Sequence, residues 1–348
     1  MVAMKVFPTT RNSIAFFSVT IVMAVLVMGL EGYIFARYED ETHKYDMQDS
    51  TSSRAIPTYF SLVIFAEIFG LLVAWDSLRL KNTIQVIGLC LYHLALMVYA
   101  IIQIDQIKEA LGPDLINDHD VWGNGSSLSI EPWLIIIPVV IGCSIVLLCY
   151  YSYRLYEEFG WTIYKHIGAD LAMHRHYMAF QIFIALLKFD FIFFVGFTIQ
   201  FIVITLNVTD PEFGLTIAVI PITILGLLFT SWALRNEKMW GMYITLTYFL
   251  CAMAYFLFKL IRMYSGPKKS LYGSAKRPLV TFAILTLALL IASIVNASIC
   301  MRNFGKGLKN YVHQRRVGTS PSSPEMLMDR WISSTDHKSP VSLRVQLD

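Results

Sequence analysis

Eight stretches of this sequence are apolar over about 20 residues each, and this feature decides what the chain can fold into. A helix of that length crosses the roughly 30 Å of hydrocarbon in a bilayer, whereas the alternating polarity of a membrane β-barrel is absent. The composition agrees, because 56% of the residues are hydrophobic and 15% are charged, while soluble chains are about 25% charged. The sequence therefore predicts an all-α, polytopic transmembrane helix bundle.

The predicted helices form one membrane domain between two tails. The spans are expected near residues 14–36, 59–75, 84–104, 134–153, 189–206, 213–234, 240–258 and 279–301. Residues 1–13 form a short N-terminal tail, and we interpret the first span as a retained anchor because no cleavage site of small residues follows it. Residues 302–348 are basic at first and become rich in Ser, Pro and Thr from Val317 onward. This composition predicts a disordered cytosolic tail.

The basic residues of the loops predict which side faces the cytosol. If the N-terminus is cytosolic, the first three loops on the far side contain 4 Lys and Arg against 13 Asp and Glu. The N-terminal tail and the first three cytosolic loops contain 10 against 5. The loop at residues 259–278 disagrees, with six basic residues and no acid. We retain eight spans with both termini cytosolic, and seven spans remain the alternative.

Three ionisable residues lie inside predicted spans, where a charge is costly and normally has a partner or a function. Glu67 and His93 have similar depths on consecutive helices, and we expect a hydrogen bond between them. This pair is either a proton or cation relay or, more simply, a packing contact. Asp190 is a candidate buried acid, and Lys188 points about 200° away from it on a helix, so each needs a different neighbour. Gln200 is expected to hydrogen-bond another helix.

The longest cytosolic connection, residues 154–188, carries apolar residues at every fourth position. This spacing predicts a helix that lies at the membrane interface. His166, Asp170 and His174 would share one face of it and could hold a metal ion or sense pH, although Gly168 interrupts the helix.

Sites of covalent modification are expected on both sides of the membrane. Asn124 begins an Asn-Gly-Ser triplet in a loop predicted to face away from the cytosol, and it is a candidate for glycosylation. The C-terminal tail contains Ser-Pro pairs that are candidates for phosphorylation, at Ser320, Ser323 and Ser339.

Several function classes find no support in the sequence. The catalytic, dinucleotide and phosphate-binding signatures are absent, the five cysteines all lie in apolar runs, and the net charge is only +3. We therefore expect a protein that is not an enzyme, has no cofactor and binds no nucleic acid. Its expected partners are the lipid bilayer, anionic lipid headgroups beside the basic tail, and other membrane proteins.

Three functions remain open from the residues. The first is a non-enzymatic component that organises or sorts other membrane proteins. It is favoured because it requires the fewest specific features in the sequence. The second is a transporter or channel for protons, a metal ion or a small solute that uses Glu67, His93 and Asp190. The third is a seven-helix receptor-like protein.

Two strings in the sequence resemble a fungal family of uncharacterised Golgi apparatus membrane proteins. They are Leu155–Ile204, which begins LYEEFGWTIYKHIGADLAMHRHY, and Asn303–Lys309, NFGKGLK. The resemblance extends in a general way over the membrane region and leaves out the polar tail. It implies a multi-pass protein of the Golgi membrane and carries no activity or ligand residue with it. Another endomembrane or the plasma membrane is the alternative, because the span lengths do not separate these membranes.

Overall fold

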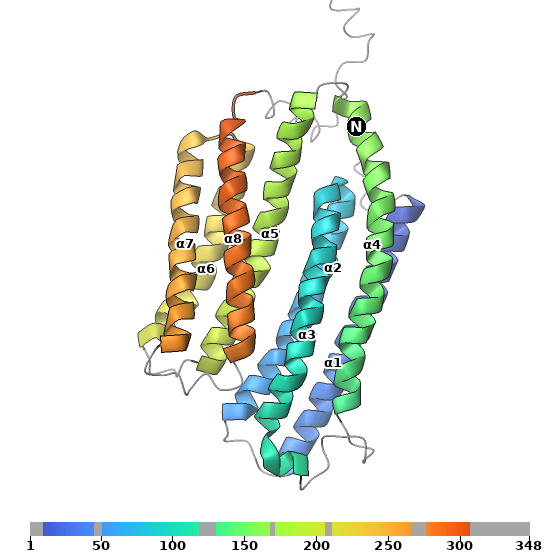
Figure 1. Ribbon diagram of the computed structural model, residues 1–348, viewed down its shortest axis with the longest axis vertical. Coiled ribbons are helices and arrows are strands. Elements are labelled where there is room, and N and C mark those ends of the chain that lie inside the picture. The colour runs from blue at the N-terminus through green and yellow to red at the C-terminus, as the bar shows by residue number, and fades with distance from the viewer. Residues whose placement is uncertain are drawn as a thin grey trace, which may run out of the picture.

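The computed structural model describes residues 10–44, 51–117, 130–167, 171–205, 211–265 and 276–306, and all regular structure in these ranges is helical. The helices are α1 (Arg11–Lys44), α2 (Thr51–Leu80), α3 (Thr83–Asn117), α4 (Glu131–Ile167), α5 (Leu171–Thr205), α6 (Pro211–Arg235), α7 (Met239–Ser265) and α8 (Lys276–Arg302). They run up and down side by side, as Figure 1 shows.

The helices pack as two halves of four. Each helix of α1–α4 contacts its neighbours in the chain, and α1 also contacts α4, so this half closes on itself. Helices α5–α8 close in the same way through a contact between α5 and α8. The halves meet where α2 and α3 contact α5 and where α3 contacts α8 (Figure 1). Much of the first hydrophobic core lies within α1–α4, and the second lies within α5–α8.

All eight helices are long and apolar enough to cross a membrane, with candidate spans of 20 to 31 residues. Large apolar side chains on their outer faces are exposed, including Val146, Leu225 and Leu91. Such faces suit hydrocarbon, which satisfies no backbone polar group and therefore favours helices. The predicted transmembrane helix bundle is confirmed, and the seven-span alternative would require one of these eight helices to stay outside the membrane.

The predicted cytosolic connection differs in shape from the expectation. Residues 155–167 are helical, but they continue α4 without a break, and α5 begins at Leu171. Gly160 does not interrupt α4, and Arg154 and Glu157 form an ion pair one turn apart, with 3.9 Å between Nη1 and Oε2. Since a glycine costs a helix only about 1 kcal/mol, the good helix formers around it prevail. Gly168, the predicted interruption, lies between α4 and α5 and outside the described residues.

The first helix starts and the last helix ends on the same side of the bundle, which we call the terminal end. At this end Nδ2 of Asn12 donates to Oε2 of Glu158, at 3.2 Å, joining the start of α1 to α4. After α8, the backbone N–H of Gly305 donates to Oε2 of Glu237 in the turn between α6 and α7. Figure 1 shows α1 starting and α8 ending on the same side. An even number of crossings gives this arrangement.

The basic loop that contradicted the charge rule is shorter than predicted. Lys259 and Arg262 belong to α7, and Lys276 and Arg277 belong to α8. Lys259 is buried, with Nζ 4.0 Å from the centroid of the Phe201 ring. Four of the six basic residues are therefore parts of helices, and their side chains can reach toward the membrane surface.

Candidate functional site

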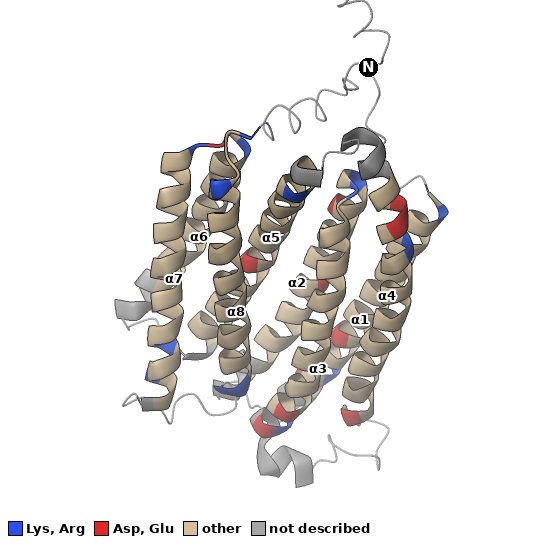
Figure 2. Ribbon diagram, turned by 45° about the horizontal axis from the view of Figure 1, so that its top comes forward, with Lys and Arg blue, Asp and Glu red and all other residues tan. Residues whose placement is uncertain are grey.

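Acidic residues lie in the middle of the bundle as well as at its ends. Figure 2 shows Lys and Arg gathered toward the two ends, while red acidic positions also occur at mid-height. Glu31 on α1, Glu67 on α2 and Asp190 on α5 are all 0% exposed. Because a charge is costly at membrane depth, these acids are the natural starting point for a functional site.

The predicted hydrogen bond between Glu67 and His93 is wrong. Neither carboxylate oxygen of Glu67 has a hydrogen-bond partner, and Nε2 of His93 has none either. Nδ1 of His93 donates to the backbone carbonyl of Leu89 at 2.8 Å. Its ring fills the space beside Gly70, where an added Cβ would lie 3.4 Å from Nε2. Helices α2 and α3 do pack together as expected, but His93 lies against Gly70, about one turn along α2 from Glu67.

Tyr92 on α3 bonds to the residue that precedes Glu67. Its hydroxyl donates to the backbone carbonyl of Ala66 at 2.7 Å. A hydroxyl has one hydrogen to donate, so Tyr92 has none left for the carboxylate. Glu67 consequently stays without a donor in the bundle interior.

Asp190 lies inside the second half. Its Oδ2 accepts a hydrogen bond of 2.6 Å from Oγ of Ser293 on α8, and its Oδ1 has no partner. Lys188 faces elsewhere and pairs with Asp76 of α2. The prediction that these two residues of α5 need different neighbours is confirmed.

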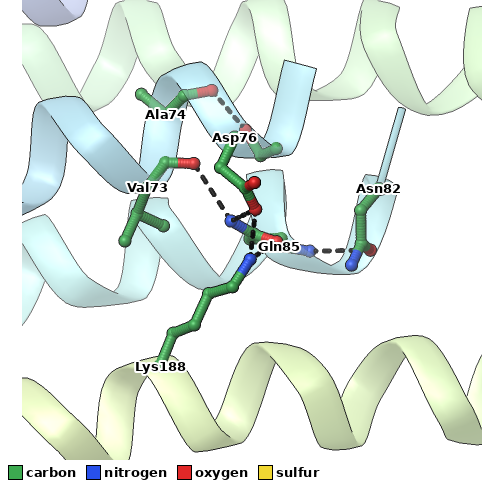
Figure 3. A network of polar contacts seen from close by, with 7 residues as sticks. Val73, Ala74, Asp76, Asn82, Gln85 and Lys188 are labelled. Atoms are coloured by element: carbon green, nitrogen blue, oxygen red, sulfur yellow. Dashed lines mark hydrogen bonds and ion pairs between the residues drawn. The ribbon is translucent and has the colours of Figure 1, made fainter. Parts of the chain in front are cut away.

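Lys188 belongs to a network that joins the two halves, shown in Figure 3. Its Nζ donates to Asp76 Oδ2 and, at 2.8 Å, to Oε1 of Gln85 on α3. Nε2 of Gln85 donates to the backbone carbonyl of Val73 at 3.0 Å and to Asp76 at 3.3 Å. Asn82 caps α3 by accepting the backbone N–H of Gln85 at 3.2 Å. The network fixes the turn between α2 and α3 against α5.

Glu31 was missed by the sequence reasoning. Its Oε2 accepts a hydrogen bond of 3.0 Å from Nε2 of Gln103 on α3, and its Oε1 has no partner. The signal was present, because Glu31 lies within the first predicted span, five residues before that span ends.

The interface between the halves contains a cavity of about 30 Å³. Its lining is mostly apolar and aromatic and comes from α2, α3, α5 and α8, with Ala66, Tyr92, Tyr99, Phe193 and Phe282 among its residues. At this interface Nε2 of Gln200 on α5 donates to the hydroxyl of Tyr99 at 3.0 Å. The predicted interhelical hydrogen bond of Gln200 is confirmed.

Other predicted sites fall wholly or partly outside the described residues. Asp170 lies outside them, and His166 is in α4 but its side chain is not described; His174 is a partly buried residue of α5. Within the described part of the chain, no three His, Cys, Asp or Glu side chains gather as metal ligands. The modification candidates also lie outside: Asn124, Ser320, Ser323 and Ser339.

Comparison with known proteins supplies the family. No family model matches the chain, and no solved structure does. A UPF0658 Golgi apparatus membrane protein of Schizosaccharomyces pombe is 34% identical over 320 residues, which cover 86% of this chain and 90% of that protein. This confirms the resemblance carried by residues 155–204. Together with the eight apolar helices, it shows that the chain belongs to the UPF0658 family of multi-pass Golgi apparatus membrane proteins.

Proposed function

We propose that this Golgi membrane protein is a non-enzymatic transporter that moves protons, alone or coupled to a small solute. The observation that carries the proposal is the burial of Glu67 and Asp190 inside membrane-spanning helices without a cationic partner. Ionisable groups at this depth are rare, and they typically mark the path of an ion or a proton. A packing role alone gives no reason for a carboxyl group with no donor.

The division into halves supports the same proposal. Glu67 lies in the first half and Asp190 in the second, and the cavity lined by Tyr92 and Tyr99 lies at the interface between the halves. Its volume of about 30 Å³ is large enough to hold a water molecule. His93 adds a third titratable group, 0% exposed and with an unpartnered Nε2. Transporters commonly bind their ions at such an interface, near the middle of the membrane.

Proton flux into liposomes tests this function. The purified protein is reconstituted around a pH-sensitive dye, and a pH step is applied with a potassium gradient and valinomycin to balance charge. We expect Glu67→Gln and Asp190→Asn each to lower the flux at least tenfold, because neither amide can carry the proton. Asp105→Asn is the matched control, since Asp105 is an acid with a 65% exposed side chain near the end of the apolar span of α3. Wild-type flux no higher than that of empty liposomes would refute the proposal.

An organising or trafficking role is the second candidate. It is supported by the C-terminal part of α4, where the aromatic side chains of Tyr153, Tyr156 and Trp161 are 62%, 53% and 61% exposed. Aromatic residues favour membrane interfaces and protein contacts, so this surface suits lipid headgroups or a membrane-protein partner. If this role is correct, replacing all three by serine removes crosslinks to partner proteins while flux and Golgi location persist. Unchanged crosslinking would exclude these aromatic residues as the contact.

A further inference from the structure

Glu31 lies near the centre of the first half. Helices α1 and α3 both pack on α2 and on α4, so they occupy opposite corners of this four-helix half. Glu31 on α1 and Gln103 on α3 are 0% and 1% exposed, and they meet through the 3.0 Å hydrogen bond from Nε2 to Oε2. A hydrogen bond between opposite corners crosses the middle of a four-helix bundle. This is the place where such bundles build sites from side chains on facing helices.

The carboxyl group of Glu31 has two different oxygens. Oε2 accepts from the neutral amide of Gln103, and Oε1 has no hydrogen-bond partner. Among the described residues, no Lys, Arg or His side chain pairs with either oxygen. A carboxylate without a counter-charge is costly at membrane depth. Because Oε2 is already an acceptor, a proton on this group belongs on Oε1.

The neighbouring helices supply no group that takes over this charge. The other buried Asp, Glu, Lys, Arg or His residues described in this half are Glu67 on α2 and His93 on α3, and neither is hydrogen-bonded to Glu31. The described side chains of α4 contribute none. Phenols remain neutral at cellular pH, and those buried in this half are Tyr38, Tyr59, Tyr92 and Tyr99. Glu31 can therefore be neutral only by binding a proton.

A second buried amide leads from Glu31 toward the end of the bundle opposite the terminal end. Gln106 follows Gln103 by about one helical turn, or about 4.5 Å along α3. It is 1% exposed, and neither its Nε2 nor its Oε1 has a partner in the part of the chain that the structure describes. A buried amide with a free donor and a free acceptor is suited to hold a water molecule. Both glutamines lie in the last quarter of the apolar span Thr83–Glu109, so this water stands between Glu31 and the far surface.

We infer that Glu31 is a proton-binding site that exchanges its proton with the end of the bundle opposite the terminal end. Gln103 is the positioning residue, and Gln106 holds the water that relays the proton. When the site unloads, the O–H bond at Oε1 breaks and the proton passes to this water, which forms a hydronium ion and passes the proton on to bulk water. The carboxylate that remains keeps the N–H of Gln103. The inference rests on the proposed function and adds a third carboxyl group to Glu67 and Asp190.

Infrared difference spectroscopy of the full-length protein in nanodiscs tests the proton on Glu31. We expect Glu31→Gln to remove one protonated-carboxyl band. Gln103→Leu should move the same band to higher wavenumber, because the C=O bond to Oε2 loses its hydrogen-bond donor. Ser293→Ala removes an equivalent donor from Asp190 in the other half and is the matched control, which should leave the Glu31 band in place. If Glu31→Gln removed no band, Glu31 would carry no proton and the inference would be overturned.

The rate of deuterium exchange tests the relay through Gln106. After a change to D₂O buffer, the Glu31 band shifts as O–H becomes O–D. We expect Gln106→Leu to slow this shift at least tenfold, because leucine holds no water, while the exchange of the remaining carboxyl bands keeps its rate. An unchanged rate at Glu31 would refute the assigned route. The persistence of the Asp190 band in each variant shows that the protein is folded.

The flux assay separates this inference from the proposed function. If the wild-type protein carries protons, Glu31→Gln should lower the flux at least tenfold, and an undiminished flux would exclude Glu31 from the path. A Glu31 band that responds to Gln103→Leu and Gln106→Leu in a protein without flux would uphold the proton site and refute transport.

Discussion

Lys188 is the residue whose replacement should weaken the fold most clearly. Lys188→Met removes the donor to Asp76 and Gln85 and leaves a partly buried carboxylate and an amide oxygen without their lysine. Loss of such a partner costs about 1–3 kcal/mol. We expect the free energy of unfolding in detergent, measured by chemical denaturation, to fall by about that amount.

Arg277 provides the control for this prediction. Its Nη1 lies 3.1 Å from Oδ2 of Asp105, and the two side chains are 67% and 65% exposed. Exposed ion pairs contribute about 0–1 kcal/mol, so Arg277→Met should change stability little. If both substitutions lowered the free energy of unfolding equally, the burial of the Lys188 network would not contribute to stability.

Helical geometry made some of these residue contacts predictable and left others open. The spacing of Lys188 and Asp190 is enough to separate their partners, and Gln200 inside a span must hydrogen-bond something. The absence of a hydrogen-bond partner for Glu67 could not be predicted, because hydropathy does not determine how α2 and α3 are placed against each other. His93 lies against Gly70, about one turn along α2 from Glu67.

Close packing between helices of the two halves depends on Gly88 of α3. A Cβ there would lie 2.6 Å from Cε2 of Phe189 on α5, and that ring already stacks on Tyr92 at 6.0 Å between centroids. Since the ring has little room to move, Gly88→Ala should destabilise the protein by about 1–3 kcal/mol. Gly32→Ala on α1, where nothing lies within 4 Å, should be neutral or slightly stabilising. Thermal denaturation that ranks the two variants the other way would contradict the packing of α3 on α5.

The existence of the helices was easier to predict than their ends. All eight predicted spans lie in separate helices of the structure, because apolar runs of this length leave few alternatives. The ends differ most where polar residues favour helix as well: α3 continues to Asn117 and α4 to Ile167. Hydropathy marks where the hydrocarbon region ends, whereas the helix itself can continue into the polar region beyond it.

The molecule as a whole should present both termini to the cytosol. Eight crossings return the chain to its starting side, and the terminal end carries the start of α1 and the end of α8. In sealed Golgi vesicles, we expect added protease to remove an epitope tag from either terminus. A tag protected at one terminus only would require an odd number of crossings and favour the seven-span alternative.

The arrangement of the helices in two halves was not predictable from this sequence alone. No internal repeat marks the division between α4 and α5. The contacts that close each half join the first helix of a set to its fourth, across three intervening connections. Local patterns of polarity do not indicate which distant helices contact each other.

The closure of α1 to α4 has a consequence for biosynthesis. Chains are made from the N-terminus, and early domains generally assemble before later ones are complete. Once α4 has left the ribosome, every helix needed to shield Glu31 on its own side of the molecule has been inserted. The nascent protein can thus shield Glu31 from lipid tails while α5 is still being translated.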